Sequence, residues 1–513
     1  MVQQATYNPP SRVLCILALA LGVFMQVLDT TIANVSLPTI AGNLGVSSNQ
    51  GTWVITSFTV CNAIGLPITA WLSRRIGEVR LYLGALLLFS LTSFLCGISD
   101  SMAMLVGFRT LQGLSAAPLY PMGQTLLLSI FPAAKRGSAL ALLGMVAVVG
   151  PIVGPILGGW LTYDYSWPWI FFINVPIGIF AATVIYAQMK NRPLQVVRAP
   201  LDYVGLTALI LGVGVLQLVL DKGNELDWFS NSWILAGTVF SAIAIVFLII
   251  WELTEKHPII NLALFRNRNF AFGTLALVMG YAGFFGINLI LPQWLQNQMG
   301  YTSTWAGLAA APLGVLPLLL SPILGRFSHH LDMRKLAAMA FVFMSASCYM
   351  RMHFTLDVDF RTVALVQLFM GAGIALFFMP TTTILLSDLS GAQIADASAL
   401  STFLRTLGGS FASSLTTWLW DRRAIFHHAQ LTEHVNSTNL AAQDYLNALS
   451  GDEASRLAQL NETITQQGFM MSTIDYFYLM MWVFAAMIAI VFLTKRARSS
   501  EVKGSSGAGA GAH

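Results

Sequence analysis

The chain has 513 residues, of which 56% are hydrophobic and only 10% are charged, and its formal net charge is +4. Soluble domains carry about 25% charged residues, so this composition excludes a soluble enzyme and indicates a protein that crosses the membrane many times. The four cysteines lie in apolar segments without metal-ligand spacing, and neither a disulfide framework nor a metal site is expected.

Fourteen apolar runs follow one another along the chain, and each is long enough to cross a hydrocarbon core of about 30 Å. The first run is too long for the apolar part of a signal peptide and contains polar residues, so it is interpreted as a retained span. The predicted spans are 12–36, 51–72, 80–98, 102–127, 137–161, 168–189, 203–220, 232–251, 270–295, 304–325, 335–353, 363–386, 397–420 and 474–494.

The distribution of Lys and Arg predicts how these spans are oriented. If the N-terminus is cytoplasmic, nineteen of the 27 Lys and Arg residues lie in inside segments, six in outside segments and two within spans. Because positive charge accumulates on the cytoplasmic side of membrane proteins, both termini are expected in the cytoplasm.

An internal repeat predicts two homologous halves. The stretch Pro67-Ile68, closing with Arg80-Leu81, reappears 255 residues later as Pro322-Ile323, closing with Lys335-Leu336, and the same offset relates Gln112 to Gln367. The expected fold class is an all-α polytopic membrane protein with two six-helix bundles and two inserted spans, an architecture typical of secondary transporters. The predicted boundaries are 1–11 for a cytoplasmic N-terminus, 12–190 for the first bundle, 191–269 for a linker with two extra spans, 270–494 for the second bundle including the outer loop 421–473, and 495–513 for a flexible tail.

Asp29 lies inside the first apolar run, where a carboxylate costs about 3 kcal/mol, and is therefore a functional candidate. Small and polar residues recur around it at steps of three and four, which places them on one helix face that points into the bundle. This stripe consists of Gly22, Gln26, Asp29, Ala33 and Ser36. From there Asp29 can reach water and change its protonation; the alternative is a structural Asp that is hydrogen-bonded to neighbouring helices.

The fourth predicted span contains a second embedded charge, Arg109, followed by Gln112 and Gly113. A buried arginine needs an acceptor, and Asp29 is the natural candidate. The pair can be a proton-coupling site, in which Arg109 holds Asp29 ionised until a proton or a substrate displaces the pairing. It can also be a fixed clamp between helices without a role in turnover.

The fifth predicted span carries a repeated Gly-Pro pattern. Its glycines at every fourth position make a smooth face for close helix approach, and its prolines bend the helix. The pattern consists of Gly150, Pro151, Gly154, Pro155, Gly158 and Gly159.

Aromatic and polar residues of several spans predict an apolar, permissive pocket for substrate. Arg405, a third embedded charge, can contact an anionic substrate group or a backbone carbonyl. Ordinary packing is the alternative for the aromatic residues. The candidate pocket residues are Gln26, Asn34, Gln112, Tyr120, Tyr281, Phe284, Asn288, Gln367, Phe378 and Arg405.

The outer loop 421–473 is far longer than an ordinary connection. Within it Leu457, Leu460 and Ile464 recur at helical spacing, so part of the loop can form an amphipathic helix. A docking surface and a partly ordered, solvated loop are both open interpretations. The chain has no phosphate-binding loop and no hydrolase arrangement of Ser, His and Asp, so ATP-driven transport within this chain and enzymatic hydrolysis lack support.

These motifs resemble the major facilitator superfamily, and specifically its 14-span drug:proton antiporter branch with the EmrB-type export proteins. Leu28–Pro38, Arg109–Gly113, Gly150–Gly159 and Trp167–Pro176 are similar to the motifs of that branch in the first, fourth, fifth and sixth spans. The loop after the second span departs from the superfamily pattern, which has Asp at the position of Arg74 and a basic residue at that of Glu78.

The resemblance implies a proton-driven multidrug efflux antiporter of the bacterial inner membrane, which exports amphipathic and hydrophobic toxic compounds. It implies no cofactor besides the proton motive force. It also implies a tripartite pump in which the chain works with a periplasmic adaptor protein of the EmrA type and an outer-membrane channel, and loop 421–473 is a candidate contact for the adaptor. The alternatives are a fatty-acid or lipid-like exporter of the same fold and a non-transporting membrane sensor or scaffold.

Overall fold

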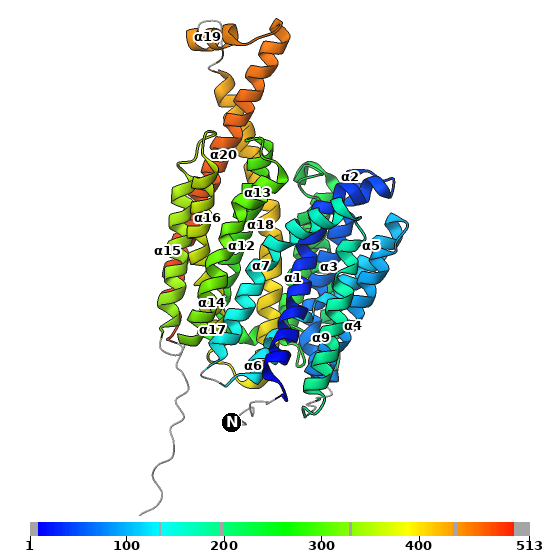
Figure 1. Cartoon of the computed structure of the whole chain (residues 1–513). Helices are drawn as coiled ribbons and strands as arrows, with labels where there is room; N and C mark the ends of the chain where they lie inside the picture. Colours follow the sequence, from blue (N-terminus) through cyan, green and yellow to red (C-terminus); the bar gives the residue numbers. More distant parts are fainter. Residues whose placement is uncertain are drawn as a thin grey trace, which may run out of the picture.

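The computed structural model describes residues 9–132, 135–193, 196, 200–327, 331–433, 435 and 439–496, and these residues form helices and connecting segments without a β-strand. Most of the expected N-terminus 1–11 and of the expected tail 495–513 lies outside the described residues. The helices stand side by side, and the first helix begins and the last helix ends at the same end of the molecule, here called the termini end (Figure 1).

The first bundle contains the predicted spans one to six. Its helices are α1 (Arg12–Asn43), α2 (Ser48–Gly51), α3 (Trp53–Ile76), α4 (Glu78–Gly97), α5 (Met102–Ala116), α6 (Leu119–Ile130), α7 (Arg136–Asp164), α8 (Trp169–Phe172) and α9 (Asn174–Met189). The fourth span consists of α5 and α6 in succession, and α7 bends by 43° at its Gly-Pro repeat, between Pro151 and Ile156. Such a bend is the usual effect of proline inside a helix.

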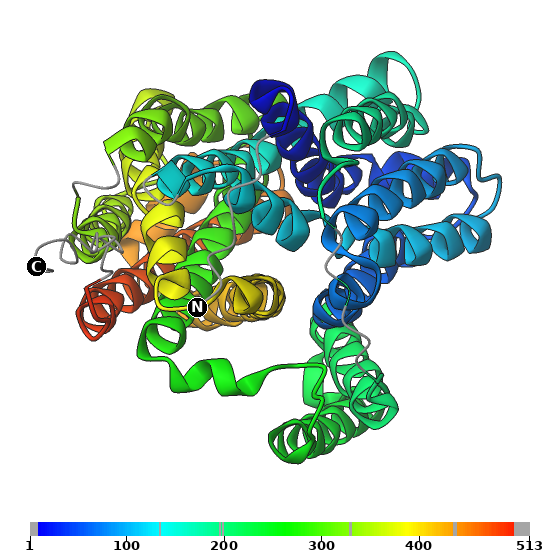
Figure 2. The same ribbon diagram turned by 90° about the horizontal axis from the view of Figure 1, so that it is seen from below.

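The two inserted spans form an antiparallel pair outside the bundles. Their helices are α10 (Tyr203–Lys222), η2 (Trp228–Ser230), α11 (Ser232–Thr254) and η3 (Leu262–Arg266), and the segment with η3 runs along one side of the molecule to the second bundle (Figure 2). α11 is apolar on most of its surface, and only 17% of its apolar 18-residue stretch is buried, as expected of a lipid-facing helix.

The second bundle contains the remaining six predicted spans. Its helices are α12 (Arg268–Asn297), α13 (Ser303–Ala310), η4 (Ala311–Gly314), α14 (Val315–Phe327), α15 (Met333–Arg351), α16 (Phe360–Ala375), α17 (Phe378–Leu386), α18 (Gly391–Glu433), α19 (Leu440–Ala448) and α20 (Glu453–Phe492). Pro67 and Pro322, which the sequence repeat relates, lie inside α3 and α14 of the two bundles.

Each of the fourteen predicted spans coincides with a helix or with consecutive helices. Ten described helices are long and apolar enough to cross a membrane by length and composition alone, or eleven if the bent α7 is counted as one span. The spans that fall short of this test are α5 with α6, α15 and α18, which are broken or carry more polar residues.

The predicted loop 421–473 is largely helical, whereas the sequence predicted a helix for only a part of it, around Leu457, Leu460 and Ile464. α18 and α20 continue past the bundle as a helical hairpin, with α19 across its tip, at the end of the molecule opposite the termini (Figure 1). Leu460 and Ile464 are buried in this hairpin, whereas Leu457 is exposed. This end is called the hairpin end below.

Several helices join the two bundles. α7 packs against α14 and α17, and α18 packs against both α3 and α6. The inserted helix α10 adds a polar connection, since Gln217 donates a hydrogen bond of 2.6 Å to Ser410 of α18 while the hydroxyl of Thr56 of α3 donates to Asp221. α10 therefore contacts both bundles with polar side chains.

Candidate functional site

Asp29 lies at the centre of a buried polar network in the first bundle. Its Oδ2 accepts a hydrogen bond of 2.6 Å from Nη1 of Arg109, and the exposed fractions of the two side chains are 0% and 1%. Its Oδ1 accepts from Nε2 of Gln112 at 3.2 Å and from Nδ2 of Asn174 at 3.0 Å. The carboxylate thus receives one charged and two neutral donors, which compensate the loss of water around a buried charge.

Arg109 reaches Asp29 from α5 and is held by three further groups. Its Nε donates to the carbonyl oxygen of Val54 at 3.0 Å, and its Nη1 also donates to Oε1 of Gln112 at 2.8 Å. The guanidinium lies 4.2 Å from the centre of the Phe58 ring, where the ring face stabilises a cation. These contacts fix the position of the charge that faces Asp29.

Asn174 is a member of this network that the sequence analysis did not select. It is the first residue of α9 and is fully buried, and its Nδ2 donates to Ser93 of α4 at 3.1 Å as well as to Asp29. The signal was present, because Asn174 is a polar residue within an apolar run and lies in the motif Trp167–Pro176. Its link to Asp29 depends on the packing of α9 against α1, which sequence spacing does not reveal.

Two glycines permit the helix contacts on which this network depends. A Cβ on Gly113 would collide with the carbonyl oxygen of Phe58, so glycine allows α5 to approach α3 closely enough for Arg109 to reach Val54. On α7, a Cβ on Gly158 would lie 2.6 Å from the carbonyl oxygen of Ile32. The Gly-Pro face of α7 therefore packs directly on the part of α1 that carries Asp29.

The other members of the Gly-Pro pattern lie along the same contact. A Cβ on Gly150 would meet Val27 at 2.5 Å, and one on Gly154 would collide with the hydroxyl of Thr31. Gly159 faces Val35 at an ordinary distance of 3.7 Å. Pro151 and Pro155 lie at the bend of α7.

Four of the candidate pocket residues meet where the two bundles face each other. The guanidinium of Arg405 lies 4.1 Å from the centre of the Tyr120 ring and 5.3 Å from that of Tyr281. Phe378 packs edge-on against Tyr281 with ring centres 6.4 Å apart. Because Tyr120 belongs to α6 of the first bundle and the other three to the second, this cluster spans the interface.

The remaining candidates lie elsewhere. Phe284 packs beside Tyr281, Asn288 donates to the carbonyl oxygen of Phe284 in its own helix, and Gln26 is buried on α1. Asn34 is exposed. Gln112 belongs to the Asp29 network, and Gln367 belongs to a separate buried pair with Arg351 in the second bundle.

An ion pair connects the bundles at the termini end. Nη1 of Arg74, on α3, lies 2.5 Å from Oδ1 of Asp396, on α18. The superfamily pattern has an acid at the position of Arg74, and in this chain an acid faces Arg74 from the other bundle. The charges across this contact thus complement each other, with the arginine on α3.

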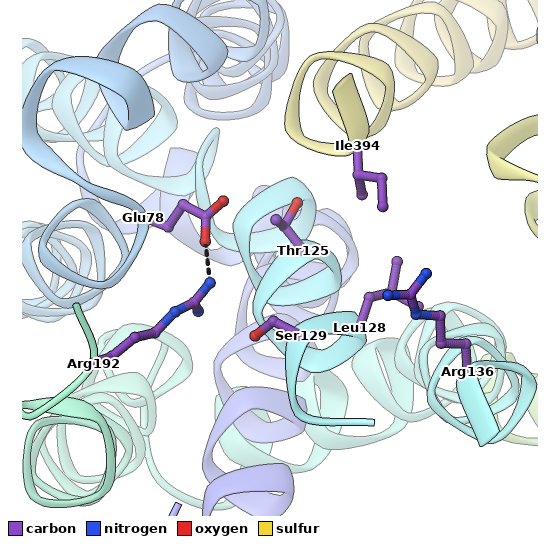
Figure 3. Close-up of a pocket in the computed structure, with 7 residues that line it drawn as sticks. All are labelled: Glu78, Thr125, Leu128, Ser129, Arg136, Arg192 and Ile394. Carbon is purple, nitrogen blue, oxygen red and sulfur yellow. Dashed lines mark hydrogen bonds and ion pairs between the residues drawn. The ribbon is translucent and has the colours of Figure 1, made fainter. Parts of the chain in front are cut away.

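A small pocket lies near this contact (Figure 3). Its wall carries the ion pair of Glu78 with Arg192, whose Oε2 and Nη2 are 2.7 Å apart, and Arg136 lies on the opposite wall. The other lining residues are Thr125, Leu128, Ser129 and Ile394. The pocket combines α4, α6 and α7 of the first bundle with α18 of the second.

The charge balance around Asp29 depends on its ionised carboxylate, which faces Arg109. Protonation of Asp29 would remove the negative charge that faces Arg109. The ion pair would become a hydrogen bond between a neutral carboxyl group and a guanidinium that no longer has a counter-charge. Such a change alters the balance of forces between α1, α5 and α9, and it requires no metal or cofactor.

Comparison with known proteins identifies related chains. The model of the Major Facilitator Superfamily matches residues 19–413. The chain is 47% identical over 517 aligned positions to the multidrug export protein EmrB of Escherichia coli strain K12, covering 100% of both chains. It is 46% identical to the fatty acid resistance protein FarB of Neisseria gonorrhoeae, covering 93% of this chain and 95% of that one.

Solved structures show the same fold at low sequence identity. The proton:xylose symporter XylE aligns with a TM-score of 0.56 at 15% identity, covering 92% of this chain and 95% of the other. The human organic anion transporter MFSD10 aligns with a TM-score of 0.55 at 14% identity, covering 93% and 100%.

Proposed function

The chain belongs to the major facilitator superfamily, and from this premise we propose that it is a proton-driven multidrug exporter of the bacterial inner membrane. Membership makes it a multi-pass membrane transporter rather than an enzyme, and transporters of this family need no cofactor. The full-length likeness to a multidrug export protein supports amphipathic and hydrophobic toxic compounds as its substrates. The single observation that carries the proton coupling is the buried ion pair of Asp29 with Arg109.

In the proposed cycle the two bundles expose a central site alternately to the two sides of the membrane. Asp29 takes up a proton from the outer side, which weakens its pairing with Arg109 and favours the state that is open to the cytoplasm. Release of the proton to the cytoplasm restores the pair and accompanies extrusion of the substrate. Arg109, Gln112 and Asn174 position the carboxylate, and the Gly-Pro face of α7 holds α1 against the bundle.

We propose that the substrate is bound at the interface between the bundles, next to Arg405. Tyr120, Tyr281 and Phe378 offer ring faces for apolar groups, and the guanidinium offers a partner for an acidic or polar group. Since Asp29 is already paired with Arg109, this cluster suits neutral and acidic amphipathic molecules better than cations. The likeness to a fatty acid resistance protein supports the second candidate, an exporter of fatty acids or similar lipids.

We further propose the orientation and the partners. The excess of Lys and Arg at the termini end supports a cytoplasmic position for both termini, and the hairpin of α18, α19 and α20 would then extend into the periplasm. The hairpin is the proposed contact for an EmrA-type adaptor, which would link the chain to an outer-membrane channel. Exposed apolar side chains on its helices, among them Ile425, Phe426 and Leu440, support a protein contact.

The domain division that we propose follows the sequence repeat. Residues 12–190 form the first bundle, 191–269 the linker with two extra spans, and 270–494 the second bundle with the periplasmic segment 421–473. Separate expression of 12–190 and 270–494, followed by co-purification, tests whether these boundaries delimit units that assemble.

Proton coupling is tested by the substitution Asp29→Asn in purified protein reconstituted into liposomes. The amide keeps the shape of the carboxyl group but carries no titratable proton, so efflux driven by a pH gradient is expected to fall by tenfold or more, on the order of the losses seen when a proton-transfer group is removed. Exchange of labelled substrate without a gradient should persist, because it requires no change of protonation.

The matched control is Asp100→Asn, which alters an exposed acid of the same bundle and should retain wild-type efflux. Gradient-driven efflux at the wild-type rate in the Asp29→Asn protein would contradict the proposal.

A further inference from the structure

Arg351 is a fully buried cation in the second bundle. It is the last residue of α15, at the hairpin end, and its exposed fraction is 0%. It lies two residues before the end of the predicted span 335–353, where contact with water would be expected. The guanidinium carbon of Arg351 lies 5.6 Å from the centre of the Phe477 ring. Phe354, three residues after Arg351, is buried and stacks on Trp294. The charge is therefore separated from bulk water although it lies near the end of a span.

The described part of the chain offers Arg351 one acceptor. Its Nη2 donates to Oε1 of Gln367, on α16, at 2.5 Å. Its Nε and Nη1 have no acceptor among the described residues, and neither has Nε2 of Gln367. No carboxylate of the described residues lies within ion-pair distance of Arg351. Three buried donor nitrogens, two of the guanidinium and one of the Gln367 amide, thus remain to be satisfied.

Such a group is costly unless something compensates it. A guanidinium does not lose its proton in proteins, so Arg351 cannot become neutral. Burying an ion without a partner is strongly destabilising, and a ring face at this distance returns only a small part of that cost. Water could accept the unused hydrogen bonds, but it would leave the charge uncompensated.

We propose that Arg351 and Gln367 bind a small inorganic anion, chloride being the most abundant, at the hairpin end of the second bundle. The anion accepts from Nη1 of Arg351 and from Nε2 of Gln367, and it supplies the negative charge that Asp29 supplies to Arg109. It stabilises the junction of α15 with α16 and α20. This site is separate from the proposed substrate cluster and does not depend on the proposed transport function.

The test is the melting temperature of the purified full-length protein in potassium chloride and in potassium gluconate of equal ionic strength. An anion bound only by the folded state raises the melting temperature with its concentration, by a few degrees at saturating chloride. We expect this rise in the wild-type protein and in Arg361→Met, which removes an exposed arginine from neighbouring α16. We expect it to be absent in Arg351→Met.

Arg351→Met should melt in gluconate at or above the temperature of the wild type, because it removes an uncompensated charge and keeps an apolar side chain of similar length. As a second variant, Gln367→Glu places a carboxylate beside Arg351 and should make the protein insensitive to chloride while it remains folded. Bromide should replace chloride in the wild type.

Three results would overturn the proposal. They are a wild-type melting temperature that is equal in chloride and gluconate, a chloride response that is retained in Arg351→Met, and one that is retained in Gln367→Glu. Each result would mean that water or a rearranged side chain satisfies Arg351 instead of an anion.

Discussion

The two bundles each bury an arginine beside a glutamine, but only the first supplies a carboxylate. Gln112 and Gln367 lie at the repeat offset of 255 residues, and the Oε1 of each accepts a hydrogen bond from a guanidinium, at 2.8 and 2.5 Å. In the first bundle Arg109 also has Asp29 and the carbonyl oxygen of Val54. In the second bundle Arg351 has neither kind of partner among the described residues.

Under the proposed function, this difference gives the two bundles different tasks. In the proposed cycle the carboxylate that faces a guanidinium gains and loses a proton, which would give the first bundle a group that responds to a pH gradient. Among the residues that the structure describes, no acid faces Arg351 in the second bundle, which keeps a fixed positive charge there. We infer that the proton acts within the first bundle, while the second contributes Arg405, Tyr281 and Phe378 to the interface that meets the substrate.

The largest expected effect comes from removing the cation of the first bundle. Arg109→Met leaves Asp29 buried and unpaired, and breaking a buried ion pair from one side costs about 3–5 kcal/mol of the free energy of unfolding. Unfolding of the purified protein in mixed micelles with increasing denaturant measures this loss. Arg351→Met removes the corresponding charge of the second bundle and, in gluconate, should cost nothing.

The double variant Asp29→Asn with Arg109→Met sharpens this comparison. It removes both charges, so it should be more stable than Arg109→Met alone although it carries one more substitution. Equal losses in Arg109→Met and Arg351→Met would show that the two arginines are buried in equivalent surroundings, and the contrast between the bundles would then be wrong.

An intermediate effect is expected at Asn174. Asn174→Leu removes a neutral donor from the charged Asp29, and a hydrogen bond to an ionised group contributes about 1.5–3 kcal/mol. The matched control in the second bundle is Asn288→Leu, because Asn288 donates only to a carbonyl oxygen of its own helix and should matter less. Denaturant unfolding compares the two, and a larger loss in Asn288→Leu would contradict the role assigned to Asn174.

The sequence was sufficient to predict the fold and the centre of the site. Apolar runs of spanning length predict helices because the membrane leaves the backbone few other ways to satisfy its hydrogen bonds. The cost of a buried charge likewise predicts that Asp29 and Arg109 would pair, and the structure places them 2.6 Å apart. Both inferences rest on physical penalties that hold for any packing of the helices.

The remaining features depend on packing that the sequence does not specify. Arg351 follows an apolar run and precedes a polar segment, which is the pattern of a solvated flanking charge, yet neighbouring helices enclose it. The hairpin of α18 and α20 has the polar composition of a loop, yet the two helices pack against each other. Arg74 and Asp396 are 322 positions apart, and only the approach of the two bundles brings them together.

The smallest expected effect concerns the contact that joins the bundles at the termini end. The side chains of Arg74 and Asp396 are 32% and 12% exposed, so their attraction is partly screened by solvent and contributes about 1 kcal/mol or less. If this pair holds the termini end closed, Arg74→Ala should raise the population that is open at this end by up to about fivefold. Spin labels on α3 and α18 and distance measurements between them give that population.

A charge exchange distinguishes a latch from an incidental surface contact. The variant Arg74→Asp with Asp396→Arg restores attraction in the opposite sense and should return the open population toward that of the wild type, whereas Arg74→Asp alone places two acids together and should open this end further. An exchanged protein that stays as open as Arg74→Asp would show that the pair does not control closure. The exchange also returns an acid to the position where the superfamily carries one, so its success would show that the closure needs opposite charges on α3 and α18 but not a particular assignment of them to the two bundles.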